Sequence, residues 1–146
     1  GCTTKHYLKI SMIHRKKEHR YMQEFDRFME VVRAIREKCP WDSTQTHESL
    51  KKYLLEESNE VLEGIDRLNK NGDSANLCEE LGDVLFQVAL HSVIAEEEGL
   101  FTVEDVIRGV SSKMKFRHPK IFAPEDERLT GLSWEELKQL ENKRGN

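Results

Sequence analysis

Two pairs of acidic residues stand inside segments that otherwise have the pattern of buried helices. The first pair is Glu57 and Glu60 in LLEESNE, and the second is Glu80 and Asp83 in EELGDVL. Residues three positions apart on a helix project from the same face, so each pair can act as one group of ligands. Ligand sets made only of oxygen suit hard divalent cations, above all Mg²⁺ or Mn²⁺. The spacing therefore predicts a metal site.

The segments that carry these pairs are expected to lie side by side. Helical patterns run over about 47–69 and 75–98, with Gly72 as a cap between them and Asp73 or Ser74 as the cap of the second helix. A connection this short joins antiparallel neighbours. The two acidic pairs can then face each other, and cations have to neutralise the repulsion among their carboxylates.

A solvated acidic face is the usual explanation for clustered glutamates, and we expect residues 96–98 to form one. Glu57 argues against that explanation for the pairs, because it falls on the apolar stripe between Leu54 and Val61. Asp83 argues against it too, because it stands in a nearly apolar run where aspartate has poor helix propensity and nothing to cap. A metal site therefore remains the favoured interpretation of the two acidic pairs.

A di-iron carboxylate bundle would also use inward-facing acids. Such a centre needs Glu-x-x-His on two helices. None of the six histidines has a glutamate three residues before it. This pattern therefore argues against di-iron ligation, and His91 is expected to be a packed or surface histidine.

The rest of the chain is also predicted to be helical. Helices are expected over about 18–37, from Thr102 to about 116 and from Ser133 to about 143, and Thr46 is expected to cap the helix over 47–69. Pro40 should follow the end of the first helix, since proline disfavours helical geometry in the residue before it. No convincing strand or repeat is found. The predicted fold class is all-α, a four-helix-bundle-like fold with a short C-terminal helix.

Composition limits the class of protein. The 146 residues suffice for one domain with a core, and the formal net charge of −4 does not indicate a general nucleic-acid surface. No apolar run reaches the roughly 18–20 residues of a membrane span, and no signal peptide is expected. The three cysteines lack framework spacing, so we expect free thiols, with Cys39 and Cys78 packed, in a reducing, cytoplasmic compartment.

Residues 1–20 form a basic extension ahead of a domain that spans residues 21–146. The extension carries Lys5, Lys9, Arg15, Lys16, Lys17 and Arg20 against one acid, Glu18. Such a segment could contact a polyanion. Because aromatic residues are sparse in it, we favour a solvated, loosely ordered segment.

Four motifs together resemble the MazG-type nucleoside triphosphate pyrophosphohydrolases of the all-α NTP pyrophosphatase superfamily. They are CPWD at 39–42, LLEESNEVLEGI at 54–65, EELGDVLFQVALHS at 79–92 and KMKFRHPKIF at 113–122. The resemblance covers about residues 22–143. EExxE with ExxD is the metal signature of the wider superfamily, whereas CPWDxxQTH and RHPxxF together mark the MazG branch.

The resemblance implies metal-dependent hydrolysis. The family's Mg²⁺ ligands match Glu57, Glu60, Glu80 and Asp83, and Glu56 completes the EExxE motif. A nucleoside triphosphate would be cleaved between its α and β phosphates, which gives the monophosphate and pyrophosphate. Glu56 or Glu60 would accept the proton of the attacking water, and the resemblance does not decide between them.

Substrate contacts are implied in the second half of the chain. Lys113 and Arg117 match the basic positions before HP that meet the phosphates. Trp134 and Lys138 match the residues of the C-terminal segment that contact the nucleotide. Structural roles remain open for three of them: a lysine on a helix face, an arginine at a helix end and a hydrophobic anchor for the last helix.

The implied role is house-cleaning of nucleotide pools. A chain with one copy of the domain would form a homodimer or a dimer of dimers, as the family does. A dedicated dCTP, dUTP or phosphoribosyl-ATP hydrolase is an alternative, which CPWD and RHPxxF disfavour. A non-catalytic helical interaction module is another, and the intact acids together with Lys113 and Arg117 argue against it.

Overall fold

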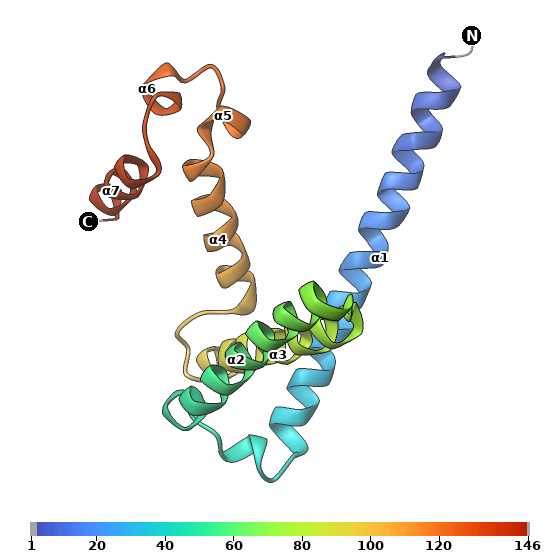
Figure 1. The fold of residues 1–146 in the computed structure, drawn as a ribbon, viewed down its shortest axis with the longest axis vertical. Helices are drawn as coiled ribbons and strands as arrows, with labels where there is room; N and C mark the ends of the chain where they lie inside the picture. Colours follow the sequence, from blue (N-terminus) through green and yellow to red (C-terminus); the bar gives the residue numbers. More distant parts are fainter. Residues whose placement is uncertain (1–2, 146) are drawn as a thin grey trace. The chain divides into compact units, whose positions relative to one another are not determined.

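Helices make up almost all of the structure. The computed structural model describes residues 3–145, and it describes the side chains of residues 15–17 and 19–145. The elements are α1 (Thr3–Lys38), the 3₁₀ helix η1 (Asp42–Thr44), α2 (His47–Asn71), α3 (Ser74–Glu97), α4 (Val103–Arg117), α5 (Pro119–Phe122), α6 (Glu127–Thr130) and α7 (Trp134–Arg144) (Figure 1). No strand occurs within residues 3–145, which confirms the all-α prediction. The chain divides after Glu98 into two compact units.

The turn between α2 and α3 follows the predicted capping pattern. Gly72 ends α2 with a φ of 70°, a left-handed conformation that glycine adopts without steric cost. Asp73 caps α3 by accepting a hydrogen bond from the backbone N–H of Asn76 at 3.1 Å. At the other end of α2, Thr46 and Ser49 form a reciprocal capping box. Helices α2 and α3 consequently pack along each other, and α1 also packs against α3.

The first unit has a small core where these three helices meet. Its fully buried side chains include Val32 of α1, Leu50 of α2, and Leu90 and Ile94 of α3. Leu90 and Ile94 are four residues apart, so they lie on one face of α3, the helix that packs against both α1 and α2. The core holds α2 and α3 in the register on which the acidic pairs depend.

Arg36 of α1 fixes the loop that carries the CPWD motif. Its Nη1 donates hydrogen bonds to the backbone carbonyls of Asp42 and Gln45 at 2.7 and 2.8 Å. Its Nε and Nη2 pair with Glu97 at the end of α3. The loop thereby places Trp41 edge-on against Tyr53 of α2, with ring centroids 5.3 Å apart.

Helix α1 differs from its prediction. It begins at Thr3 rather than near residue 18, so the expectation of a loosely ordered segment is wrong from residue 3 onward. This stretch contains no proline and no glycine after Gly1, and lysine, arginine and leucine favour a helix. The side chains of residues 1–14 and of Glu18 lie outside the described residues, and contact of the basic extension with a polyanion stays a prediction.

The second unit contains α4 to α7. Thr102 and Ser133 cap α4 and α7 in capping boxes with Asp105 and Glu136, three residues further along the chain in each case. The four-residue helices α5 and α6 were not predicted. Elements this short offer no period of apolar residues to recognise.

The cysteines are only partly as expected. Cys39 is half-buried and Cys78 is exposed, and both are free thiols. The expectation that both cysteines are packed is therefore wrong for Cys78, which lies on a solvent-facing side of α3. Cys2 lies outside the described residues.

Candidate active site

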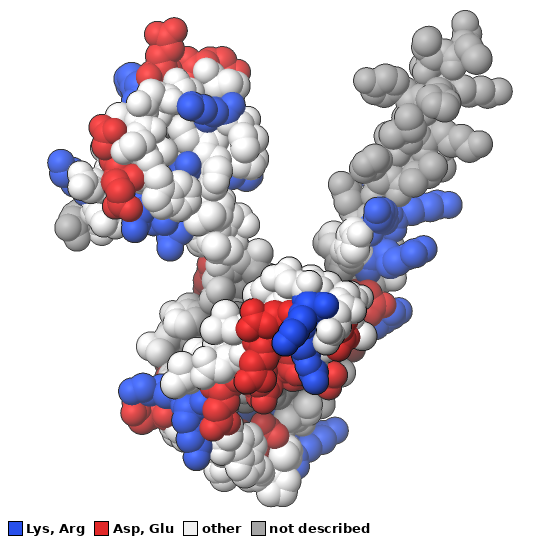
Figure 2. Space-filling view, viewed as in Figure 1, with Lys and Arg blue, Asp and Glu red and all other residues white. Residues whose placement is uncertain are grey.

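Four carboxyl groups converge between α2 and α3. They belong to Glu57 and Glu60 of α2 and to Glu80 and Asp83 of α3, and one oxygen from each lies within 4.8 Å of the others. Glu57 and Glu80 are half-buried, whereas Glu60 and Asp83 are exposed. Figure 2 shows a group of acidic side chains on the surface of the unit formed by α1, α2 and α3. The helix pair thus brings together all four residues that the sequence assigned to the metal.

A glycine allows the two helices to approach each other beside this cluster. Gly64 of α2 is buried and faces the start of α3. A Cβ atom at this position would lie 3.2 Å from Oδ1 of Asn76 and 3.3 Å from Cα of Leu77. Because these distances are shorter than ordinary van der Waals contact, a larger residue here would require Asn76 or the backbone of α3 to shift. Asn76 also contacts the cluster directly, since its Nδ2 lies 3.4 Å from Oε1 of Glu80.

The carboxyl groups of the cluster perturb one another. Hydrogen bonding with Glu57, together with the negative charges of Glu57 and Asp83, raises the pKa of Glu60 above its ordinary value. Loss of solvent around Glu80, followed by its interaction with Glu60, raises the pKa of Glu80. Both shifts mean that the ionised cluster is unfavourable without a nearby positive charge.

The cluster fits a hard divalent cation. Oε2 of Glu57 and Oε2 of Glu80 are buried and have no hydrogen-bond partner in the described part of the chain. Among the described side chains, no lysine or arginine forms an ion pair with any of the four acids. Buried carboxylate oxygens without partners are costly, and coordination of a cation removes that cost. Glu56 is exposed and lies outside the converging four.

The residues assigned to the substrate lie in the second unit. Lys113 is exposed on α4, and Lys138 of α7 is half-buried and lies 3.8 Å from Glu135. Arg117 ends α4, and its guanidinium carbon lies 5.3 Å from the ring centroid of Trp134 on α7. The structure therefore brings Arg117 and Trp134 together. A joint site with the acids of the first unit stays a prediction.

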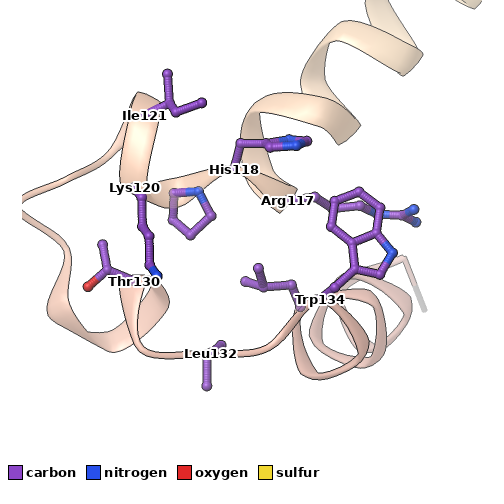
Figure 3. Close-up of a pocket in the computed structure, with 9 residues that line it drawn as sticks. Arg117, His118, Lys120, Ile121, Thr130, Leu132 and Trp134 are labelled. Carbon is purple, nitrogen blue, oxygen red and sulfur yellow. The ribbon is translucent and has the colours of Figure 1, made fainter.

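Arg117 and Trp134 also border a cavity of about 350 Å³. The cavity lies between α5, the segment after α6 and the start of α7, and Ile121, Thr130 and Leu132 contribute to its lining (Figure 3). Trp134 is 43% exposed. Its indole ring also lies edge-on to His118, with ring centroids 5.4 Å apart. The ring is thus held by two neighbours and still accessible to a ligand.

Two residues near the assigned ones were not predicted. The only sequence signal for Gly64 was its position within LLEESNEVLEGI. No sequence pattern indicates that a given glycine will contact a neighbouring helix. Glu141 forms an ion pair with Arg117, from Nε to Oε2 at 2.9 Å. Its spacing on α7 relative to Trp134 and Lys138 places it on the same helix face, which was the available signal.

Comparison with known proteins identifies the family of this chain. A sequence profile of the MazG nucleotide pyrophosphohydrolase domain matches residues 45–122. The chain belongs to the MazG family. The matched range contains all four converging acids of this MazG chain, together with Lys113 and Arg117.

Curated relatives of this MazG chain are longer than the chain itself. It is 46% identical over 131 residues to the uncharacterized protein YabN of Bacillus subtilis, and this match covers 86% of this chain and 26% of that protein. It is 45% identical over 119 residues to the nucleoside triphosphate pyrophosphohydrolase/pyrophosphatase MazG of Thermotoga maritima, and this match covers 80% of this chain and 45% of that protein. It is 37% identical over 126 residues to the nucleoside triphosphate pyrophosphohydrolase of Escherichia coli K12, and this match covers 82% of this chain and 46% of that protein. The chain spans about half of these relatives or less.

A solved structure shows the same fold. The crystal structure of a mazG-related protein from Thermotoga maritima aligns with a TM-score of 0.57 at 31% identity, over 82% of this chain and 97% of that one. Within the described residues, no helix is both long enough and apolar enough to cross a membrane.

Proposed function

We propose that this chain hydrolyses nucleoside triphosphates to nucleoside monophosphate and pyrophosphate with the help of Mg²⁺ or Mn²⁺, and that it acts in the house-cleaning of nucleotide pools. The convergence of four carboxyl groups in a MazG domain carries the proposal. The relatives from Thermotoga maritima and Escherichia coli are named as enzymes of this kind, which supports the same substrate class.

The acids of α2 and α3 have two tasks in the proposed reaction. Glu57, Glu60, Glu80 and Asp83 hold the cation, which when bound neutralises phosphate charge and lowers the pKa of the attacking water. The proton of that water has to go to a carboxylate that is not fully engaged with the metal. Glu56 lies outside the converging four and is exposed, so we assign it this role in preference to Glu60.

The basic residues of the second unit hold the substrate. Lys113, Arg117 and Lys138 supply positive charge for the phosphate oxygens, and the Trp134 ring offers an exposed face to the nucleotide. Charge on the triphosphate increases at the leaving pyrophosphate as the bond breaks. Cations at any phosphate therefore favour binding, and those at the leaving pyrophosphate also favour the reaction.

We further propose a homodimer or a dimer of dimers in the cytoplasm. Large apolar side chains remain exposed on α2 and α3 of the single chain, and they are Leu54, Leu55, Leu62, Ile65, Leu68, Leu81, Leu85 and Val88. Monomeric proteins rarely expose so many apolar side chains on neighbouring elements. A second copy of the chain would cover them.

Release of pyrophosphate from a panel of NTPs and dNTPs, with Mg²⁺ and with EDTA, tests the function. We expect release that depends on the cation and that disappears in Glu57→Ala and Asp83→Ala. Glu63→Gln, which removes an exposed acid of α2 outside the cluster, is the matched control and should retain activity. No release from any nucleotide by folded, oligomeric protein would refute the proposal.

A further inference from the structure

Arg117 and Glu141 form a shielded ion pair between two helices. Nε of Arg117 lies 2.9 Å from Oε2 of Glu141, and Nη2 lies 3.5 Å from Oε1. The side chains are only 13% and 28% exposed. The pair joins the last residue of α4 to the third turn of α7. Solvent and salt weaken such a shielded pair less than an exposed one.

The pair uses one edge of the guanidinium group. A planar guanidinium can bind one acceptor group through Nε and Nη2, and another through Nη1 and the second N–H of Nη2. Glu141 occupies the first edge, and Nη1 lies outside the pair. The face of the group is held as well, because Trp134 lies 5.3 Å from its central carbon. Helix α7 therefore contacts Arg117 at one edge and one face, and the second edge is not part of either contact.

We propose that Glu141 is a positioning residue, which holds Arg117 so that its second edge binds a phosphate of the substrate. This inference rests on the proposed function. An arginine side chain has many rotamers, and binding a phosphate through a mobile one costs the entropy of fixing it. Glu141 and Trp134 have fixed it before the substrate arrives.

Steady-state kinetics of Glu141→Ala tests this role, with the best nucleotide of the panel as substrate. We expect KM to rise about three- to tenfold, the effect of releasing one long side chain, while kcat changes less than about twofold. The Ki of inorganic tripolyphosphate should rise by the same factor, because the contact is to phosphate. Glu125→Ala is the matched control, since it removes an exposed glutamate from the same unit.

A double-mutant cycle separates this role from a merely structural one. If Glu141 acts through Arg117, then Arg117→Ala raises KM by itself, and adding Glu141→Ala to it changes KM no further. Glu141→Asp, which restores the charge, should recover part of the lost affinity. Thermal unfolding and gel filtration show whether Glu141→Ala folds. If it does not, Glu141→Gln replaces it in the KM measurements and in the double-mutant cycle.

Three results would overturn the inference. KM and the tripolyphosphate Ki could be unchanged in Glu141→Ala, or the same rise could persist in the Arg117→Ala background. In both cases an active wild-type protein shows that the proposed function stands and that only Glu141 was misassigned. Wild-type protein without pyrophosphate release would remove the proposed function and this inference together.

Discussion

Glu60 of α2 and Glu80 of α3 meet across the helix pair, and their interaction contributes to a raised pKa of Glu80. A carboxyl group whose pKa is higher in the folded than in the unfolded protein stabilises the fold below its ordinary pKa. That contribution is lost as the pH rises through the folded pKa. At neutral pH without a cation, the cluster therefore opposes folding, and the residues proposed to hold the cation reduce stability.

Glu80→Gln should separate these two effects. It removes a proposed metal ligand and should abolish turnover, but in EDTA it should raise Tm above that of the wild type at pH 7. The gain should grow as the pH rises from 4.5, the ordinary pKa of this group, to 7, because only the wild type then acquires the opposed charge. Thermal unfolding at several pH values measures it. A variant less stable than the wild type at pH 7 would show that the cluster does not oppose folding.

Glu56→Gln should reduce kcat without reducing metal affinity. Loss of a general base lowers the rate by about a hundredfold or more, whereas Mn²⁺ binding, followed by calorimetry, should stay close to that of the wild type. Glu60→Gln should weaken Mn²⁺ binding, because Glu60 is one of the converging four. If the two variants exchanged these properties, Glu60 would be the base and Glu56 a ligand.

Gly64→Val should push α2 and α3 apart at the cluster. The added atoms meet Asn76 and Leu77, with the Cβ already 3.2 Å from Oδ1 of Asn76. We expect a loss of about 1–3 kcal/mol in the free energy of unfolding, as for other overpacked sites, together with weaker Mn²⁺ binding. Gly109→Ala is the control, because nothing lies within 4 Å of its Cβ position and alanine favours a helix. Equal stability and affinity in Gly64→Val would mean that close approach at this glycine is not required.

His47 and His91 form a pair that should make stability depend on pH. Their Nδ1 atoms lie 2.8 Å apart, Nε2 of His91 is buried without a partner in the described residues, and Nε2 of His47 lies 3.7 Å from Glu98. Burial, and then the charge of His47, lowers the pKa of His91. Stability present at higher pH is thus lost as the pH falls through 6.5, the ordinary pKa of His91, toward its lower folded value.

Replacing His91 tests that dependence. Asparagine can place a polar atom near the Nδ1 position but does not titrate between pH 5 and 8. His91→Asn should therefore lose less stability than the wild type when the pH falls from 7 to 5, in urea unfolding at each pH. The matched variant His19→Asn, an exposed histidine of α1, should follow the wild type. A steeper loss in His91→Asn would contradict the pKa assignment.

The convergence of the acids was predictable because every step to it is local. Three-residue spacing puts each pair on one face, and the turn at Gly72 makes their helices neighbours. The close approach at Gly64 was not predictable, because it depends on which side of α3 faces α2. The pair of Arg117 and Glu141 joins residues 24 positions apart in separate helices. Which acid pairs with Arg117 depends on how α4 and α7 pack against each other. No periodic pattern in either helix specifies that packing.

The phosphorus NMR spectrum of the products tests the central claim most directly. Wild-type protein with its preferred nucleoside triphosphate should give monophosphate and pyrophosphate with Mg²⁺, and neither with EDTA or in Asp83→Ala. Formation of the diphosphate and inorganic phosphate instead, or the same products from Asp83→Ala and in EDTA, would contradict hydrolysis by a cation held between α2 and α3.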